Sequence, residues 1–156
     1  ILVTEEKPWA LFRNKIFNEG FQIIKDFDLE EDQRDFDSVY DLYNSILSHE
    51  SQVIQIKNNN DLDIQDLQKL KKIIDKVNGR LDIITQAQVI QVDILDGEIT
   101  LETADLKLIW GLSKNKVGNT IKKLDHLLSK IEENISKIEY IDLSLDTDEA
   151  IIGKRL

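Results

Sequence analysis

Apolar side chains recur at alternating intervals of three and four residues through two long stretches of this chain. The first stretch runs from residue 67 to residue 95 and the second from residue 106 to residue 141. An average interval of 3.5 residues is typical of helices whose apolar seams pack against other helices. The spacing therefore predicts two long helices that pair as an antiparallel coiled-coil hairpin.

Two shorter helices are expected before this hairpin. Pro8 suits the first turn of a helix, and the apolar residues after it return at helical spacing, which predicts a helix over about 8–26. An acidic start and a second apolar stripe predict another helix over about 32–57. The three asparagines at 58–60 favour its termination, because asparagine competes for backbone hydrogen bonds.

The expected fold class is therefore all-α, an elongated up-and-down four-helix bundle whose last two helices form the long hairpin. One proline and six glycines in 156 residues leave few forced breaks, which favours long helices over many short strands. The bundle is expected to occupy residues 1–142 as a single domain. Residues 143–156 lose the periodicity and are expected to be a tail or a docking strap.

The Asp96-Gly97 pair allows a second interpretation of the residues around it. As a helix–helix connection, Gly97 ends one helix and Thr100 caps the next. As a β-hairpin turn, Asp-Gly joins two strands in which the β-branched residues of 89–94 pair with the residues after the turn. In that hairpin the facing pairs are Ile94 with Ile99 and Val92 with Leu101. The helical interpretation is preferred, since the three-four spacing continues on both sides of the turn.

The sequence contains no motif that is typical of catalysis. There is no cysteine, no glycine-rich phosphate loop and no dinucleotide-binding fingerprint. Two acidic clusters, 26–30 and 59–63, lack the glycine and the distal glutamate of a calcium loop. His49 and His126 lie in separate predicted helices. We therefore expect a protein that is not an enzyme and that holds no cofactor or metal.

The net charge of −10 disfavours general binding to nucleic acid. Residues 103–130 reverse this sign, with six lysines against two aspartates. A helix-turn-helix DNA-binding regulator over residues 103–124 is therefore an alternative, with Lys114, Asn115 and Lys116 facing the major groove. Lys107 stands where this motif needs a small residue, and the segment has no arginine to read guanine, which both disfavour it.

The start of the chain leaves another alternative open. Ile1 is not an initiator methionine, so the chain could be an extracytoplasmic helical receptor or surface domain that was trimmed from a longer protein. No stretch is apolar enough to insert in a membrane. A cytoplasmic location is slightly favoured, and a surface or secreted one stays open.

The expected function is a structural or adaptor module that binds proteins, or a second copy of itself, through coiled-coil seams. Polar seam residues fix the register and the number of helices, which suggests a specified partner. The residues expected to contact it are Gln88, Gln91, Leu95, Leu106, Leu124, Leu128, Ile131, Asn134, Ile135 and Ile138.

Overall fold

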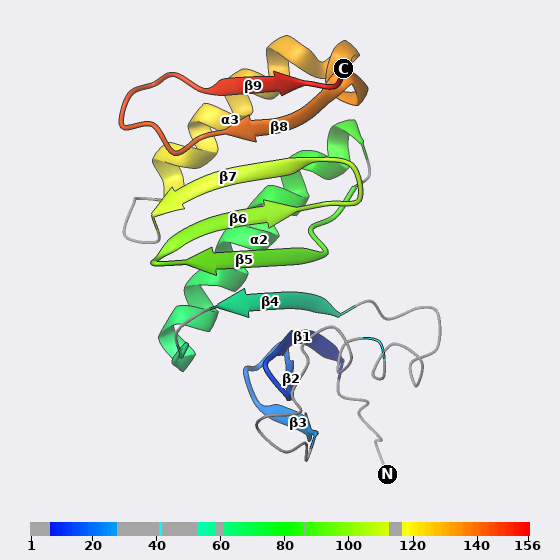
Figure 1. The fold of residues 1–156 in the computed structure, drawn as a ribbon, viewed down its shortest axis with the longest axis vertical. Coiled ribbons are helices and arrows are strands. Elements are labelled where there is room, and N and C mark those ends of the chain that lie inside the picture. The colour runs from blue at the N-terminus through cyan, green and yellow to red at the C-terminus, as the bar shows by residue number, and fades with distance from the viewer. Residues whose placement is uncertain (1–6, 28–40, 42–52, 59–60, 86, 113–116) are drawn as a thin grey trace. The chain divides into compact units, whose positions relative to one another are not determined.

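The computed structural model describes residues 7–27, 41, 53–58, 61–85, 87–112 and 117–156. The chain divides into two compact units, Ile1–Lys57 and Asn58–Leu156. The described residues form nine β-strands, the α-helices α2 and α3, and one 3-10 helix (Figure 1). The prediction of an all-α four-helix bundle is therefore wrong, and with it the coiled-coil hairpin.

The first unit is built on a small mixed sheet. Its strand order is β3-β2-β1-β4, in which β1 pairs antiparallel with β2, β2 pairs antiparallel with β3, and β1 pairs parallel with β4. The strands are β1 (Pro8–Phe12), β2 (Lys15–Asn18), β3 (Ile23–Asp26) and β4 (Ile54–Asn58), the last residue of which belongs to the second unit.

The helix predicted over 8–26 is thus three strands and two turns. The residues from Trp9 to Phe12 are all buried, so this strand has apolar side chains on both faces. A continuous apolar run contains helical spacing as well as strand spacing, and periodicity alone does not distinguish them. The turns occur where Arg13 and Phe21 take positive φ angles of 57° and 64°.

The second unit begins with α2 (Ile64–Ile84), whose N-cap is Asp63. Three antiparallel strands follow, namely β5 (Gln91–Leu95), β6 (Glu98–Glu102) and β7 (Lys107–Leu112). Asp96 and Gly97 form the β5–β6 turn with φ angles of 52° and 82°. Positive φ at both positions is what a two-residue hairpin turn needs.

A crossover completes the sheet of the second unit. After β7 the chain forms α3 (Val117–Ile131) and the 3-10 helix η2 (Glu132–Lys137), and then β8 (Ile138–Asp142) pairs parallel with β7. The last strand, β9 (Ile151–Lys154), pairs antiparallel with β8. The strand order of this unit is therefore β5-β6-β7-β8-β9.

Both described helices cover the same face of this sheet, and the face that neither of them covers is called the open face (Figure 1). An ion pair of 2.6 Å between Arg80 Nε and Asp125 Oδ1 joins α2 to α3. The strand register places Val92, Leu101 and Leu108 in one row on the covered face. The buried helical side chains that meet this face are Leu67, Leu70, Ile73, Ile74, Val77, Leu81, Ile121, Leu124 and Leu128.

The three-four spacing located parts of both helices but extended them too far. Helix α2 continues through Asn78-Gly79, as expected, and ends at Ile84 instead of near Leu95. Beyond it the hairpin interpretation is the correct one, because Ile94 pairs with Ile99 and Val92 with Leu101. A strand buried on one face and a helix seam both repeat apolar residues at short intervals. The three-four spacing therefore continues past the end of α2 into strand β5, although the helix does not.

Two other expectations concern residues 32–57 and 103–124. Most of the helix predicted over 32–57 lies outside the described residues, and its end at 54–57 is strand β4. The helix-turn-helix needs a helix before its turn, yet Lys107–Leu112 is strand β7, which rules out that motif. Lys114, Asn115 and Lys116 lie outside the described residues.

No helix in the described part of the chain is both long and apolar enough to cross a bilayer.

Candidate functional site

Strand β9 ends the strand order of the second unit. Its inner side pairs with β8, and no other strand among the described residues pairs with its outer side. A terminal strand presents a row of backbone donors and acceptors that can pair with another chain. The outer side of β9, together with the side chains around it, is the candidate site, which we call the β9 edge.

The direction of the backbone groups along β9 follows from one hydrogen bond. The Arg155 N–H donates to the Lys137 carbonyl oxygen at 2.8 Å, so the backbone of Arg155 faces β8. Consecutive residues of a strand direct their N–H and C=O groups to alternate sides. The N–H and C=O groups of Ile152 and Lys154 therefore face outward.

The Tyr140 ring on β8 lies against the backbone of Gly153. These two residues are paired in the strand register. A Cβ atom built on Gly153 would lie 2.0 Å from Tyr140 Cε1, far inside van der Waals contact. Only a residue without a side chain allows the ring to approach the backbone this closely. The ring itself forms an apolar surface on the open face beside the β9 edge.

The exposed side chains of the edge combine an apolar centre with charged ends. Ile151 is 47% exposed, which is high for an isoleucine in a strand. The loop that precedes β9 carries Asp146, Asp148 and Glu149, whereas Lys154 and Arg155 follow the centre. The Arg155 guanidinium also donates to the backbone carbonyl of Asp105.

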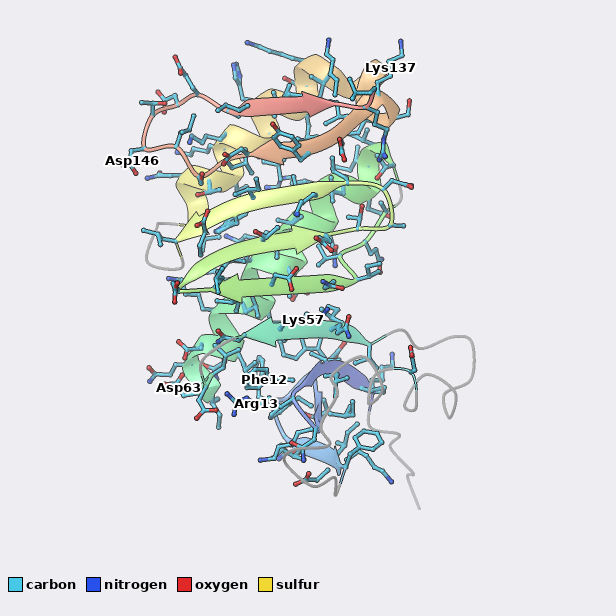
Figure 2. All side chains as sticks on the ribbon, viewed as in Figure 1. Phe12, Arg13, Lys57, Asp63, Lys137 and Asp146 are labelled. Carbon is cyan, nitrogen blue, oxygen red and sulfur yellow. The ribbon has the colours of Figure 1, made fainter. Side chains whose placement is uncertain are left out.

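The loop between β8 and β9 is held to helix α3 by Lys123. The Lys123 Nζ donates to the carbonyl oxygens of Leu143 at 3.2 Å and Leu145 at 2.6 Å. At the start of the loop, the Asp142 carboxylate accepts hydrogen bonds from Ser144 N and Ser144 Oγ. The path of the chain into β9 is thus determined by contacts within this unit. Asp146 lies in this loop, at the opposite end of β8 from Lys137 (Figure 2).

A pocket of about 620 Å³ lies between this loop and the first half of α3. Its charged lining mixes cationic Lys122 and Lys123 with anionic Asp146 and Asp148, and His126 lies beside them. Lys123 is engaged with the loop carbonyls. Because both signs of charge are present, the lining selects no single class of small molecule.

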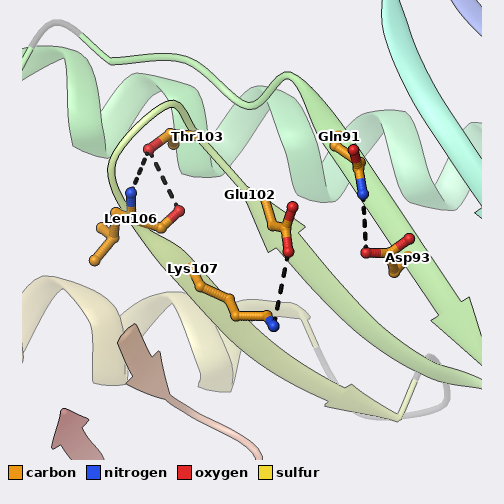
Figure 3. Close-up of polar contacts among 6 residues, drawn as sticks. All are labelled: Gln91, Asp93, Glu102, Thr103, Leu106 and Lys107. Carbon is orange, nitrogen blue, oxygen red and sulfur yellow. Dashed lines mark hydrogen bonds and ion pairs between the residues drawn. The ribbon is translucent and has the colours of Figure 1, made fainter. Parts of the chain in front are cut away.

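The open face of the sheet carries paired polar groups along its first three strands. On this face Gln91 Nε2 donates to Asp93 Oδ2 at 3.1 Å, and Lys107 Nζ lies 3.7 Å from Glu102 Oε1 (Figure 3). At the β6–β7 turn, Thr103 Oγ1 accepts the N–H of Leu106 at 3.0 Å. The exposed Leu95 of β5 lies on the same face as Gln91 and Asp93, so this face also has an apolar side chain far from β9.

The structure disperses the residues predicted to contact a partner. Leu106, Leu124, Leu128 and Ile138 are buried within the second unit. Gln91 and Leu95 lie in β5, with Leu95 64% exposed, and Gln88 is exposed just before that strand. Ile131 and Ile135 are half-buried around the end of α3, and Asn134 lies in η2. No residue of this set lies on β9, so whether any of the exposed members binds a partner stays a prediction.

Sequence reasoning missed the residues of the β9 edge. The segment Ile151-Ile152-Gly153 has the β-branched pair that favours a strand, and a glycine where close packing is needed. Residues 143–156 lack the three-four spacing, which predicts a tail or docking strap and outweighs this local signal for a strand.

Comparisons with known proteins give one partial similarity. No family profile matches the chain. A stretch of 79 residues, half of this chain, is 32% identical to the tRNA modification GTPase MnmE of Mesomycoplasma hyopneumoniae (strain 7448). The match spans 17% of that protein. The chain itself contains no Gly-x4-Gly-Lys-Ser/Thr phosphate loop.

Proposed function

We propose that the second unit is a protein-docking module that binds an extended peptide segment by strand addition at the β9 edge. One observation carries the proposal: β9 is the terminal strand, and the backbone groups of Ile152 and Lys154 face away from β8. In strand addition the backbone hydrogen bonds supply affinity, and side-chain contacts supply specificity.

The surroundings of β9 support this role. Terminal strands that must avoid partners are commonly short, or carry proline, lysine, inward-pointing charge, a bulge or a covering loop. Strand β9 is four residues long and carries Lys154, but it has no proline, and Ile151 is left 47% exposed at its start. The Tyr140 ring offers the incoming segment an apolar contact on the open face.

The proposal replaces the coiled-coil adaptor. The seam residues Leu67, Leu81 and Leu124 are buried against the sheet, so they are not available to a partner helix. The proposed role is a binding one without catalysis. The sequence contains none of the motifs that are typical of catalysis.

A proline substitution tests the outer side of β9 without changing its pairing with β8. Lys154→Pro removes an outward N–H, and proline is tolerated in an edge strand at such a position. Lys154→Ala removes the same side chain and keeps the N–H, so it is the matched control. Peptides selected on the wild-type protein from a displayed random library serve as the probe.

We expect the selected peptides to bind Lys154→Ala as well as wild type and to lose at least tenfold in affinity for Lys154→Pro. Amide resonances of residues 151–155 should shift when a peptide binds. Equal binding to both variants, with unchanged resonances on β9, would reject the β9 edge as the docking site.

The partial similarity to MnmE supports a second candidate function. The matched stretch could form a non-catalytic part of a tRNA-modifying assembly, which predicts binding to tRNA. The net charge of −10 opposes it, since affinity for nucleic acid depends on cationic groups. A filter-binding titration with unmodified tRNA at low salt distinguishes the two, because the docking module is expected to show no saturable binding.

A further inference from the structure

We infer that the segment that docks on the β9 edge is strand β9 of a second copy of this chain, so that two copies join their sheets across a two-fold axis. The inference rests on the proposed function, because it names the partner of the same site. The backbone direction, the side chains and the charges of residues 146–155 support it.

The outward groups allow an antiparallel pairing of β9 with itself. Two terminal strands form hydrogen bonds only between residues whose N–H and C=O groups face outward on both strands. Ile152 and Lys154 have this direction. A two-fold axis at Ile152 pairs this residue with its own copy and pairs Lys154 with Ala150 of the second copy.

This register also covers the exposed apolar residue of the edge. With the axis at Ile152, Ile151 of one copy lies opposite Gly153 of the other. Gly153 has no side chain there, and the Tyr140 ring lies against it. Ile151, which is 47% exposed in the single chain, would therefore pack beside an aromatic ring on the same face.

When two copies of this segment run antiparallel, the charges of one copy are complementary to the charges of the other. Three acidic residues precede β9, namely Asp146, Asp148 and Glu149, and two basic residues, Lys154 and Arg155, end it. In the two-fold register Glu149 lies opposite Arg155 of the second copy, and the symmetry repeats this pair. Opposite charges that face each other across strands favour that register over slipped ones.

The paired strands are short, so the association should be weak and concentration-dependent. Stable interfaces bury about 1,200–2,000 Å² in total. A pair of strands of four residues each buries less than that, even with the Ile151 contacts.

Charge reversal tests the pairing. Glu149→Arg places two arginines opposite each other, and Arg155→Glu places two glutamates opposite each other. We expect each variant alone to raise the dimer dissociation constant at least fivefold in sedimentation equilibrium. An equimolar mixture of the two should dimerise again, because every facing pair is then Arg–Glu. Asp82→Arg, which makes the same charge change on α2, is the control and should leave the dimer unchanged.

The outcomes separate this inference from the proposed function. Recovery of dimer in the mixture, and not in either variant, supports the two-fold pairing. A monomer at all concentrations that still binds selected peptides at β9 overturns the second copy as partner and leaves the docking site intact. A monomer that binds no peptide at β9 overturns both. A dimer that none of the charge changes affects places the contact elsewhere and also overturns the inference.

Discussion

At the scale of the residue, adding a single methyl group at Gly153 is expected to lower the stability of the protein. The Tyr140 ring occupies the space that a Cβ would need, with Cε1 at 2.0 Å and Cδ1 at 2.4 Å. The ring would have to leave its place over the β9 backbone, because the clash involves a side chain between paired strands. The contact therefore couples the aromatic surface of the open face to the position of the terminal strand.

We expect Gly153→Ala to lower the free energy of unfolding by about 1–3 kcal/mol, which is the usual cost of overpacking. Urea denaturation of the variant measures it. Gly79→Ala is the matched control, since nothing lies within 4 Å of its Cβ position and it is inside α2. That change should instead stabilise the protein by about 0.5–1 kcal/mol.

Tyr140→Ala gives a second check on the same contact. In that background Gly153→Ala should lose most of its cost, because the ring that causes the clash is absent. Equal costs of Gly153→Ala with and without the ring would show that the glycine is needed for another reason.

At the scale of the element, the start of helix α2 is stabilised by hydrogen bonds in its first turn. The Asp63 carboxylate accepts the N–H of Asp66 at 2.8 Å, and the Asp66 carboxylate accepts the N–H of Asp63 at 3.2 Å. This reciprocal cap pairs backbone donors that the helix leaves without a partner.

We expect Asp63→Ala to cost about 1 kcal/mol of stability, while Asp63→Asn, which can still cap, should cost little. Thermal denaturation of the two variants side by side measures the difference. Equal losses would indicate that the charge at the helix start matters more than the cap.

The loop before β9 depends on one lysine of α3. Lys123→Met removes both hydrogen bonds to the loop carbonyls and retains much of the apolar stem. Losing about 1 kcal/mol of local stability should speed amide exchange in residues 143–150 roughly fivefold. Hydrogen-exchange mass spectrometry measures it, with Lys122→Met as control; unchanged exchange would mean that the loop is held by other contacts.

The elements that sequence patterns predicted well are those with one buried face. In α2 and α3 the apolar residues at three-four spacing are the ones that meet the sheet. The Asp96-Gly97 turn also specifies the correct register in the hairpin interpretation, whereas the three-four spacing on both sides of it favours a helix that does not form. In β1 four consecutive residues are buried, so the apolar run fits helical spacing as well as strand spacing and does not identify the strand.

At the scale of the whole molecule, the chain divides into two compact units. The second unit, Asn58–Leu156, contains its own sheet and both described helices. Each unit also holds one of the two tryptophans, Trp9 in the first and Trp110 in the second, and both are buried.

We expect the fragment 58–156 to fold without the first unit, because it is a compact unit that contains five strands and both described helices. Its Trp110 should emit at the short wavelength of a buried indole and shift in one cooperative urea transition. The full chain with Trp9→Phe is the control, since its emission also reports on Trp110 alone. A red-shifted fragment without a transition would mean that the second unit needs the first to fold.

The sequence by itself determined what depends on neighbours along the chain. It located most of α2, the centre of α3 and the Asp96-Gly97 turn, and it excluded thiol chemistry and phosphate-loop chemistry through the residues it lacks. Only the tertiary structure decided that β7 pairs parallel with β8 across α3, that β9 is the terminal strand, and that Gly153 lies under Tyr140. Strand pairing joins residues far apart in the chain, and its energy comes from contacts that no local interval between side chains encodes.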